Sequence, residues 1–324
     1  MLISCFDAVL SDLDGVVYTG PNAIEGAPEA LGRLAGMGVE LAYITNNASR
    51  SPEVVARHIR QLGAPAEAGT VFGSADAGAD LLAERIPPQS KVLVVGSAYL
   101  RDCVVSRGMT LAESAEESPA AVIQGFDPDV NWCDLAEAAH ALNAGAMWVA
   151  TNTDMTIPRA RGLAPGNGAL VRAVSSATSA EPLIAGKPEP LLFQVAAEQL
   201  EASKPLVVGD RLDTDILGGN RAGFATAVVL TGVDDPAAVL GAPADQRPRF
   251  LLGTLAELYL DYPIVQATGK QIVCGHSRAG VENGKITVEG SREDLNSWRA
   301  ACCAWWYANP HATERTTPEI SFNS

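Results

Sequence analysis

Apolar runs rich in β-branched residues alternate with helix-like segments along most of this 324-residue chain. Residues 8–13 and 39–45 are such runs, and residues 27–37 between them place apolar side chains on one helical face. A further helix is predicted to begin after Ser51, with Ser51 as its N-cap and Pro52 as its first residue. Continuous apolar strands that alternate with helices are typical of a parallel sheet covered on both faces. The pattern therefore predicts an α/β fold with a doubly wound, Rossmann-like sheet.

A second alternating block of strands and helices begins near residue 75. A chain of this length also exceeds the usual size of one domain. We therefore expect a catalytic core formed by residues 1–76 and 182–260, interrupted by a smaller α/β cap domain over residues 77–181. Within the cap, residues 153–168 are rich in Gly and Pro and predict a loop.

The C-terminal segment, residues 261–324, has a different pattern, because strand-like stretches precede an amphipathic helix over residues 291–307. This order predicts a small α+β appendage. Trp298 and Trp305 are seven residues apart and share one face of that helix, which indicates core packing. The last dozen residues are predicted to form a frayed end.

Four polar clusters each follow directly after an apolar run. They are Asp12-Leu13-Asp14-Gly15, Thr45-Asn46-Asn47, Gly186-Lys187-Pro188, and Asp210 with Asp213 and Asp215. In open α/β sheets, ligands bind outside the carboxyl ends of the strands. The four clusters are therefore predicted to meet at one site. Asp213 is interpreted as a loop or capping residue, not as a ligand.

The residue types in these clusters suit the hydrolysis of a phosphate monoester. Asp12 can act as a nucleophile and form an aspartyl-phosphate, while Asp14 can protonate the leaving alcohol and later deprotonate water. Mg²⁺ prefers oxygen ligands such as the carboxylates of Asp12 and Asp210, and it lets an anionic nucleophile approach an anionic phosphate. The Thr45 hydroxyl can donate a hydrogen bond to a phosphoryl oxygen, and Lys187 adds a positive charge.

The remaining candidate residues are expected to contact the substrate. They are Gly15, Asn46 and Asn47 in the first two clusters, and Asn152, Asp154, Arg159 and Arg161 in the cap. A plain surface loop is an equally good interpretation of the cap residues.

The four clusters resemble the motifs of the haloacid dehalogenase superfamily of phosphatases. DLDG is similar to the first motif, ITNN to the second, GKP to the third and GDRLDTD to the fourth. The long insertion resembles the large cap of the NagD-like or para-nitrophenyl-phosphatase-like branch, which allows a homodimer through the cap. The resemblance covers roughly residues 5–260.

The resemblance implies Asp12 as nucleophile and Asp14 as acid and base. It implies that Mg²⁺ is bound by the Asp12 carboxylate, the Asp14 backbone carbonyl and Asp210. Asp215 would orient metal-bound water or Lys187 from outside the ligand set. Capping of the next helix is the alternative role for Asp215.

The chain also resembles actinobacterial glycerol-3-phosphate phosphatases, which carry a C-terminal module resembling part of a GNAT acetyltransferase. This likeness implies that the substrate is glycerol 3-phosphate, a small phosphorylated metabolite. The segment over residues 262–310 contains no clear pyrophosphate-binding Gly-rich loop, so acetyl transfer is not expected. The alternative substrates are a nucleoside monophosphate, pyridoxal phosphate and phosphoglycolate. The alternative classes are a phosphotransferase or phosphomutase, against which Asp14 argues because it can activate water, and a non-catalytic regulatory protein.

The net charge of −15 makes nucleic acid and anionic membranes poor partners. The first residues contain no basic region and predict a strand instead of a signal peptide, and no uncharged apolar stretch approaches the length of a membrane span. The six Cys form no CxxC pair, which favours buried, reduced thiols. We therefore expect a cytoplasmic protein.

Overall fold

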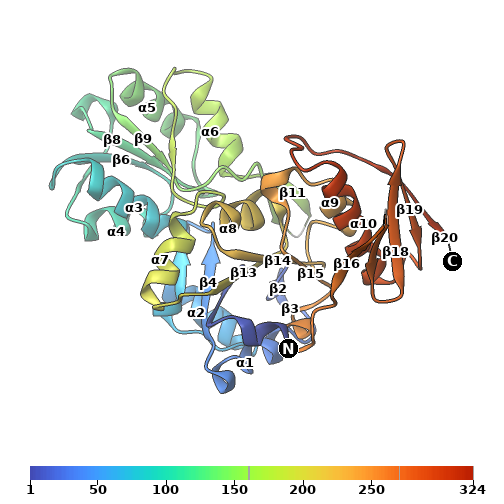
Figure 1. Cartoon of the computed structure of the whole chain (residues 1–324). Helices are drawn as coiled ribbons and strands as arrows, with labels where there is room; N and C mark the ends of the chain where they lie inside the picture. Colours follow the sequence, from blue (N-terminus) through green and yellow to red (C-terminus); the bar gives the residue numbers. More distant parts are fainter. Residues whose placement is uncertain (160, 270, 324) are drawn as a thin grey trace. The chain divides into compact units, whose positions relative to one another are not determined.

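The computed structural model describes residues 1–159, 161–269 and 271–323, and only the backbone of Pro158 and Arg159. The chain folds into two compact units. Unit 1 contains Met1–Leu41, Leu62–Pro65 and Leu200–Ser324, and unit 2 contains Ala42–Gln61 and Ala66–Gln199 (Figure 1). Parallel strands with helices between them occur in both units, which confirms the predicted α/β class. The domain boundaries expected from the sequence stay a prediction.

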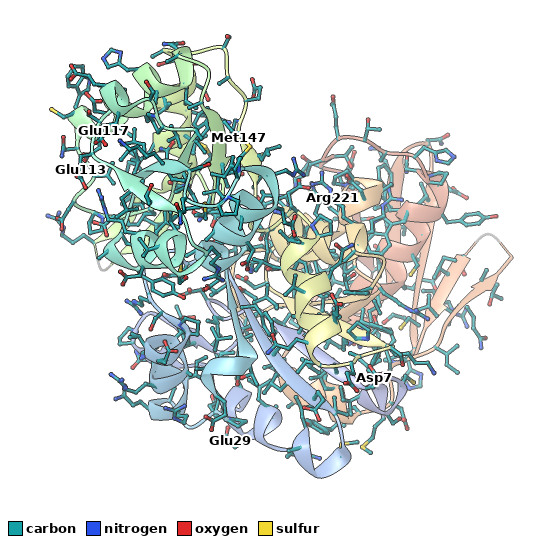
Figure 2. The ribbon with its side chains drawn as sticks, turned by 90° about the vertical axis from the view of Figure 1, so that its left-hand side faces the viewer. Asp7, Glu29, Glu113, Glu117, Met147 and Arg221 are labelled. Atoms are coloured by element: carbon teal, nitrogen blue, oxygen red, sulfur yellow. The ribbon has the colours of Figure 1, made fainter. Side chains whose placement is uncertain are left out.

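Four parallel strands of unit 1 lie in the order β15-β14-β13-β1. Their bounds are Ala8–Ser11 for β1, Pro205–Gly209 for β13, Ala225–Val229 for β14 and Phe250–Leu252 for β15. Every residue of β1 and β13 is buried, as continuous apolar runs predict. At the amino ends of these two strands, Asp7 accepts hydrogen bonds from the backbone N–H groups of Ser203 and Lys204, each at 2.9 Å. Asp7 is labelled in Figure 2.

Short elements complete this part of unit 1. They are the strands β2 (Tyr18–Thr19) and β3 (Asn22–Ala23), the helices α1 (Ala27–Gly32), α8 (Leu217–Arg221) and α9 (Pro236–Leu240), 3-10 turns at Leu2–Cys5, Ala35–Met37, Ala244–Gln246 and Leu255–Tyr259, and a π-helical turn at Leu212–Ile216. The helix expected over residues 27–37 is therefore interrupted after Gly32, where glycines at 32, 36 and 38 lower helix propensity.

Unit 2 contains a five-stranded parallel sheet in the order β12-β9-β8-β6-β7. Its strands are β6 (Lys91–Val95), β7 (Thr110–Ala112), β8 (Ala121–Gln124), β9 (Met147–Ala150) and β12 (Leu183–Ile184). The helices α4 (Ala98–Ser106), α5 (Trp132–Asn143) and α6 (Asn167–Ser175) lie between these strands in the chain, and α7 (Leu191–Gln199) follows β12 and contacts α3 (Ser74–Arg85) and β5 (Val71–Gly73). Trp148 is buried in the core of this sheet.

The same unit contains a second parallel pair, in which the carboxyl end of β4 (Glu40–Thr45) lies beside β5 (Val71–Gly73). Two helices and a 3-10 turn accompany them: α2 (Pro52–Gln61), α3 (Ser74–Arg85) and the turn Ala68–Thr70. Helix α2 begins at Pro52, as predicted. A further 3-10 turn at Ala115–Glu117 precedes β8, and the N–H of Glu113 donates to Glu117 at 2.8 Å. Both residues are labelled in Figure 2.

The Gly/Pro-rich stretch over residues 153–168 is not the loop that its composition predicts. It forms an antiparallel hairpin of β10 (Thr156–Arg159) and β11 (Gly162–Pro165), after which α6 begins. Two of its glycines allow close backbone approach. A Cβ at Gly166 would lie 2.4 Å from the carbonyl oxygen of Asp154, and one at Gly168 would lie 2.1 Å from that of Thr153. These glycines are therefore required for close backbone contact. The prediction was wrong because it took the high Gly and Pro content as the mark of a loop.

The C-terminal part of unit 1 is a five-stranded sheet, β16-β17-β18-β19-β20, with α10 packed against it (Figure 1). Its bounds are β16 Val265–Thr268, β17 Gln271–Cys274, β18 Ser277–Glu282, β19 Lys285–Glu289, α10 Leu295–Ala308 and β20 Glu319–Asn323. We call this part, residues 265–323, the C-terminal module. Its core is continuous with residues of β14 and α9, and Trp298 and Trp305 are buried in it as predicted.

The prediction of a frayed C-terminal end is wrong. β20 pairs in parallel with β19, with Ile286 opposite Ile320 and Val288 opposite Phe322. The ring of Phe322 packs 5.1 Å from that of Trp298. Alternate apolar residues bury one face of this strand, which orders the segment.

Among the described residues, no helix is both long and apolar enough to cross a membrane. The six Cys are free thiols. Cys103, Cys274 and Cys302 are buried, whereas Cys5 and Cys133 are exposed, so the expectation of burial is wrong for those two. Both lie outside the apolar faces of the elements around them, the first at the end of a 3-10 turn and the second in the first turn of α5.

Candidate active site

Three carboxylates meet at the carboxyl ends of β1 and β13. Asp12, Asp210 and Asp215 each place one oxygen within 4.8 Å of the others. Asp12 follows β1, and its backbone N–H donates to Val208 at 2.8 Å, so the two neighbouring strands deliver Asp12 and Asp210 to the same edge. Asp215 comes from the π-helical turn after β13. The structure thus brings together the first and fourth sequence clusters.

This donor set fits a divalent cation. Asp210 and Asp215 are 2% and 1% exposed, and carboxylates this close to one another repel unless a positive charge compensates them. Carboxylate oxygens are the ligands that Mg²⁺ prefers. The Asp215 carboxylate also accepts the N–H of Arg211 at 3.2 Å. Its predicted role outside the ligand set stays a prediction, and its geometry would also allow direct ligation.

The side chain of Asp14 is exposed just beyond Asp12. An acid that protonates a leaving alcohol must be accessible to the substrate, so this exposure suits the predicted role. Asp213, in the π-helical turn Leu212–Ile216, is also exposed and pairs with Arg211 at 3.0 Å. Its interpretation as a loop or capping residue stays a prediction.

A loop after β14, residues 231–234, surrounds Asp210. The Val233 N–H donates to Asp210 Oδ2 at 2.8 Å, and the Asp234 N–H donates to the Asp210 carbonyl at 3.1 Å. The Thr231 hydroxyl donates to the Gly15 carbonyl at 2.7 Å. None of these loop residues was predicted from sequence to belong to the site, and β14 ends at Val229, shortly before the loop. The polar residues after that apolar run were the available signal.

Two glycines keep space for the Asp210 carboxylate. A Cβ on Gly15 would lie 2.3 Å from Asp210 Oδ2, and a Cβ on Gly232 would lie 2.0 Å from it. Gly15 also has a φ of +82°, in the left-handed region. Its predicted contact with substrate is untested, but its contact with Asp210 already requires glycine.

In unit 2, Asn46 joins the second and third sequence clusters. Asn46 Oδ1 accepts the N–H of Lys187 at 2.8 Å, and Asn46 Nδ2 donates to the carbonyl of Lys187 at 3.1 Å. Nδ2 also lies 3.1 Å and 3.2 Å from the two carboxylate oxygens of Asp154. Gly186 is required beside them, because its Cβ would lie 2.5 Å from Asn46 Oδ1.

Lys187 is a buried cation, only 4% exposed, and its ammonium group donates to the Ile44 carbonyl at 3.3 Å. Thr45 is buried too, and its hydroxyl accepts the N–H of Asn47 at 3.1 Å, leaving the hydroxyl hydrogen available as a donor. Asn47 itself is exposed.

Of the cap candidates, Asn152 and Asp154 join this cluster and Arg161 is placed elsewhere. The Asn152 amide donates to the Asn46 carbonyl at 2.8 Å, and Asn152 is 4% exposed. Arg161 is exposed in the turn of the β10–β11 hairpin, and its contact with substrate stays a prediction. The side chain of Arg159 lies outside the described residues.

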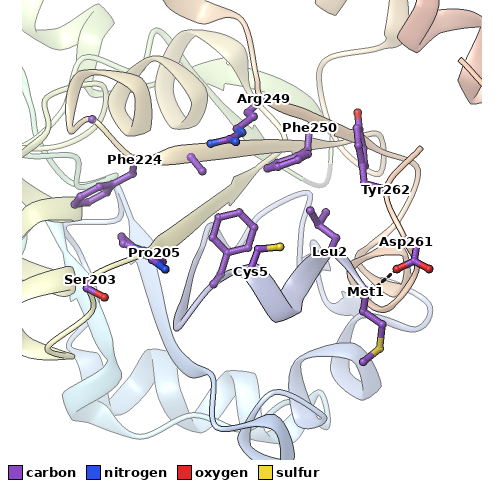
Figure 3. A pocket seen from close by; sticks show the side chains of 14 residues that line it. Met1, Leu2, Cys5, Ser203, Pro205, Phe224, Arg249, Phe250, Asp261 and Tyr262 are labelled. Carbon is purple, nitrogen blue, oxygen red and sulfur yellow. Dashed lines mark hydrogen bonds and ion pairs between the residues drawn. The ribbon is translucent and has the colours of Figure 1, made fainter. Parts of the chain in front are cut away.

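A hollow of about 590 Å³ in unit 1 lies at the amino ends of β13, β14 and β15 (Figure 3). Phe6, Pro205, Phe224, Phe250 and Tyr262 are among the residues that line it. Asp12 follows β1 and Asp210 follows β13, so both lie at the opposite, carboxyl edge of this parallel sheet. The hollow is therefore not the site at which the acidic cluster acts.

Comparison with known proteins agrees with this geometry. A haloacid dehalogenase-like hydrolase family model matches residues 9–110, and a related HAD-hydrolase-like model matches residues 184–258. The D-glycerol 3-phosphate phosphatase of Mycobacterium tuberculosis is 40% identical over 307 residues, covering 93% of this chain and 86% of that protein.

Two solved structures extend the comparison. A glycerol phosphate phosphatase from Mycobacterium tuberculosis, in complex with magnesium, has a TM-score of 0.88 and 37% identity, and the match covers 100% of this chain and 95% of that one. NagD from Escherichia coli K-12 has a TM-score of 0.70 and 31% identity, with coverage of 78% and 97%. The chain belongs to the haloacid dehalogenase-like hydrolases.

Proposed function

We propose that this chain, a magnesium-dependent phosphatase, hydrolyses glycerol 3-phosphate to glycerol and inorganic phosphate. The substrate assignment rests on how much of the chain each structural match covers. The match to the mycobacterial glycerol phosphate phosphatase extends over 100% of the chain, including the C-terminal module, whereas the match to NagD covers 78%. NagD thus shares the fold over a shorter span, while the full architecture is shared with a protein named for glycerol phosphate.

The chemistry proposed for this chain begins with attack by Asp12. One carboxylate oxygen of Asp12 forms a bond to phosphorus as the bond from phosphorus to the glycerol oxygen breaks. Asp14 gives its proton to that oxygen, so glycerol leaves as a neutral alcohol. The product of this step is an aspartyl-phosphate on Asp12.

Hydrolysis of the aspartyl-phosphate completes the cycle. Asp14, now a carboxylate, takes a proton from water as the water oxygen bonds to phosphorus. The bond from phosphorus to Asp12 breaks, which releases inorganic phosphate and restores both groups. In both steps, we expect the Thr45 hydroxyl and the Lys187 ammonium to stabilise the negative charge on the phosphoryl oxygens. The action of all four sequence clusters on one phosphoryl group is part of the proposal.

Asp12, Asp210 and the backbone carbonyl of Asp14 are the proposed ligands of Mg²⁺, with Asp215 beside them. When bound, Mg²⁺ supplies positive charge that lowers the repulsion between the Asp12 carboxylate and the phosphate dianion. We also propose that residues 77–181 act as a cap that selects the leaving group, that the protein forms a homodimer through this cap, and that it works in the cytoplasm.

The test is phosphate release by the purified full-length protein with Mg²⁺ over a panel of phosphate monoesters. The panel contains glycerol 3-phosphate, p-nitrophenyl phosphate, a nucleoside monophosphate, pyridoxal phosphate and phosphoglycolate. We expect the highest kcat/KM with glycerol 3-phosphate, no release in excess EDTA, and equal amounts of glycerol and phosphate. A higher kcat/KM for another metabolite would overturn the substrate assignment, and a deficit of free phosphate relative to glycerol would indicate phosphotransfer.

A further inference from the structure

Asp234 connects three parts of the chain around the acidic cluster. Its backbone N–H donates to the Asp210 carbonyl at 3.1 Å, and its Oδ2 accepts the N–H of Leu212 at 2.7 Å. These bonds hold Asp210 and Leu212, the residues on either side of Arg211 in the segment after β13. The residue before Asp234, Val233, donates its N–H to Asp210 Oδ2. Asp234 is 9% exposed, so these contacts are largely shielded from water.

The third contact of Asp234 comes from the C-terminal module. Arg315, in the segment between α10 and β20, places Nη2 3.1 Å from Asp234 Oδ1. The two carboxylate oxygens of Asp234 therefore have different partners, one in the metal-binding segment and one in the module. An aspartate fixed at both oxygens has little rotational freedom about its side-chain torsions.

The segment that carries Arg315 is itself anchored beside α9. Thr316 donates its N–H to the Gly241 carbonyl at 2.9 Å, and the Ala244 N–H donates to the Ala312 carbonyl at 2.8 Å. A Cβ at Gly241 would lie 2.0 Å from the carbonyl oxygen of Thr316, which shows how closely the two backbones approach. The position of Arg315 is thus set by backbone hydrogen bonds to the segment after α9 as well as by its ion pair.

We propose that Asp234 is a positioning residue for the metal-binding segment, and that Arg315 couples the C-terminal module to Mg²⁺ affinity through it. The inference rests on the proposed function, because it takes Asp210 as a ligand. The module then has a role in catalysis without contributing a group to the reacting atoms. Metal affinity depends on ligands held in place before the ion binds, so a less constrained Asp234 allows Asp210 to sample more positions and weakens binding.

The direction of the change in Mg²⁺ affinity distinguishes a positioning role of Arg315 from a direct effect of its charge. Arg315 is a cation close to an acidic cluster, so its charge alone opposes Mg²⁺ binding, and its removal would tighten binding. A positioning role predicts that Mg²⁺ binds more weakly after Arg315 is removed. Arg315 is 49% exposed on its side chain, and pairs of this exposure have modest effects, so we expect a change of roughly two- to fivefold.

The experiment compares wild type, Arg315→Gln, Asp234→Asn and the double variant as full-length, metal-free proteins. Mg²⁺ binding is measured by calorimetry, and the Mg²⁺ dependence of phosphate release is measured in parallel. We expect Arg315→Gln to raise the Mg²⁺ Kd roughly two- to fivefold, with kcat at saturating Mg²⁺ nearly unchanged. In the Asp234→Asn background, the same change should have no further effect on the Kd.

Lys285→Gln is the matched control. It removes a cation of the same module that pairs with Glu319 at 2.9 Å, with exposed side chains of 63% and 70%. It should leave the Mg²⁺ Kd at the wild-type value. An unchanged or lower Kd for Arg315→Gln would overturn the inference while leaving the phosphatase proposal in place. A wild-type protein that neither binds Mg²⁺ nor releases phosphate would overturn both.

Discussion

Asn46 and Lys187 are 141 residues apart, yet the side chain of one forms two hydrogen bonds with the backbone of the other. Oδ1 of Asn46 accepts the Lys187 N–H at 2.8 Å, and Nδ2 donates to the Lys187 carbonyl at 3.1 Å. This pairing reproduces what a neighbouring β-strand would supply to the backbone of Lys187. The structure therefore assigns the Asn46 amide a holding role, in addition to the predicted contact with substrate.

Asn46→Ala should lower both stability and turnover. The substitution leaves the N–H and the carbonyl of Lys187 without these partners, and an unsatisfied buried group costs about 1–3 kcal/mol. We expect a lower Tm and a fall in kcat of about tenfold or more, because the Lys187 ammonium loses its fixed position. Thermal unfolding and steady-state kinetics with glycerol 3-phosphate measure the two effects. Asn143→Ala is the control, because it removes an exposed amide of the same unit that donates to the Ala177 carbonyl at 3.0 Å. An equal loss in both variants would contradict the holding role.

Asp12→Asn should abolish phosphate release. The amide is a far weaker nucleophile than the carboxylate, and removing a covalent catalyst costs at least about 10³-fold in kcat. Asp213→Asn is a matched control in the same acidic region, since its carboxylate is 55% exposed and pairs with Arg211. We expect Asp213→Asn to keep nearly full activity. Turnover by Asp12→Asn that persists after the protein is shown to be free of deamidated chain would rule out Asp12 as nucleophile.

Asp210→Ala should change the response to metal. Loss of a carboxylate ligand should raise the Mg²⁺ concentration for half-maximal activity by about tenfold or more, because each charged ligand contributes strongly to binding a hard cation. Titration of Mg²⁺ against phosphate release, with calorimetry of the metal-free protein, measures the change. A Mg²⁺ response equal to that of wild type would remove Asp210 from the ligand set.

The strand ends that carry Asp12 and Asp210 were predictable from sequence because each follows a run of apolar residues that alternates with helices. The residue types of the acidic cluster could therefore be read from short stretches of sequence. The part played by the loop at residues 231–234 could not be predicted in this way, because Asp234 contacts the N–H of Leu212, 22 residues earlier, and Arg315, 81 residues later. Such a role depends on which loops meet, and no local pattern encodes that.

The end of the chain illustrates the same limit in a strand. Residues 319–323 alternate in the manner of a half-buried strand, but polar residues and Pro318 precede them. Their partner, β19, runs parallel and ends 30 residues earlier, and parallel neighbours need a crossover connection, here α10. The alternation of apolar and polar residues is visible in the sequence. The pairing with β19 that makes this segment a strand is a contact between distant parts of the chain.

Gly15→Ala should disturb the acidic cluster, and the chain offers a close control. Gly15 has φ +82° and its Cβ would lie 2.3 Å from Asp210 Oδ2, whereas Gly20 has φ +58° and its Cβ would meet nothing within 4 Å. Both alanine variants carry the strain of a left-handed backbone, about 1 kcal/mol. Only Gly15→Ala should also weaken Mg²⁺ binding and lower kcat. Equal kinetics in the two variants would show that the contact with Asp210 is relieved without consequence.

Asp7 should make the stability of the protein depend on pH at low pH. Burial raises the pKa of Asp7, but hydrogen bonds from Ser203 and Lys204 outweigh it and hold the pKa below its ordinary value of 3.8. Because the folded-state pKa is lowered, the stabilisation is fully present above the unfolded-state pKa and is lost as pH falls through the folded-state pKa. Asp7→Asn should therefore lower the Tm at pH 7, and the difference from wild type should shrink below about pH 4. A wild-type advantage that stays constant down to pH 2.5 would contradict the assignment.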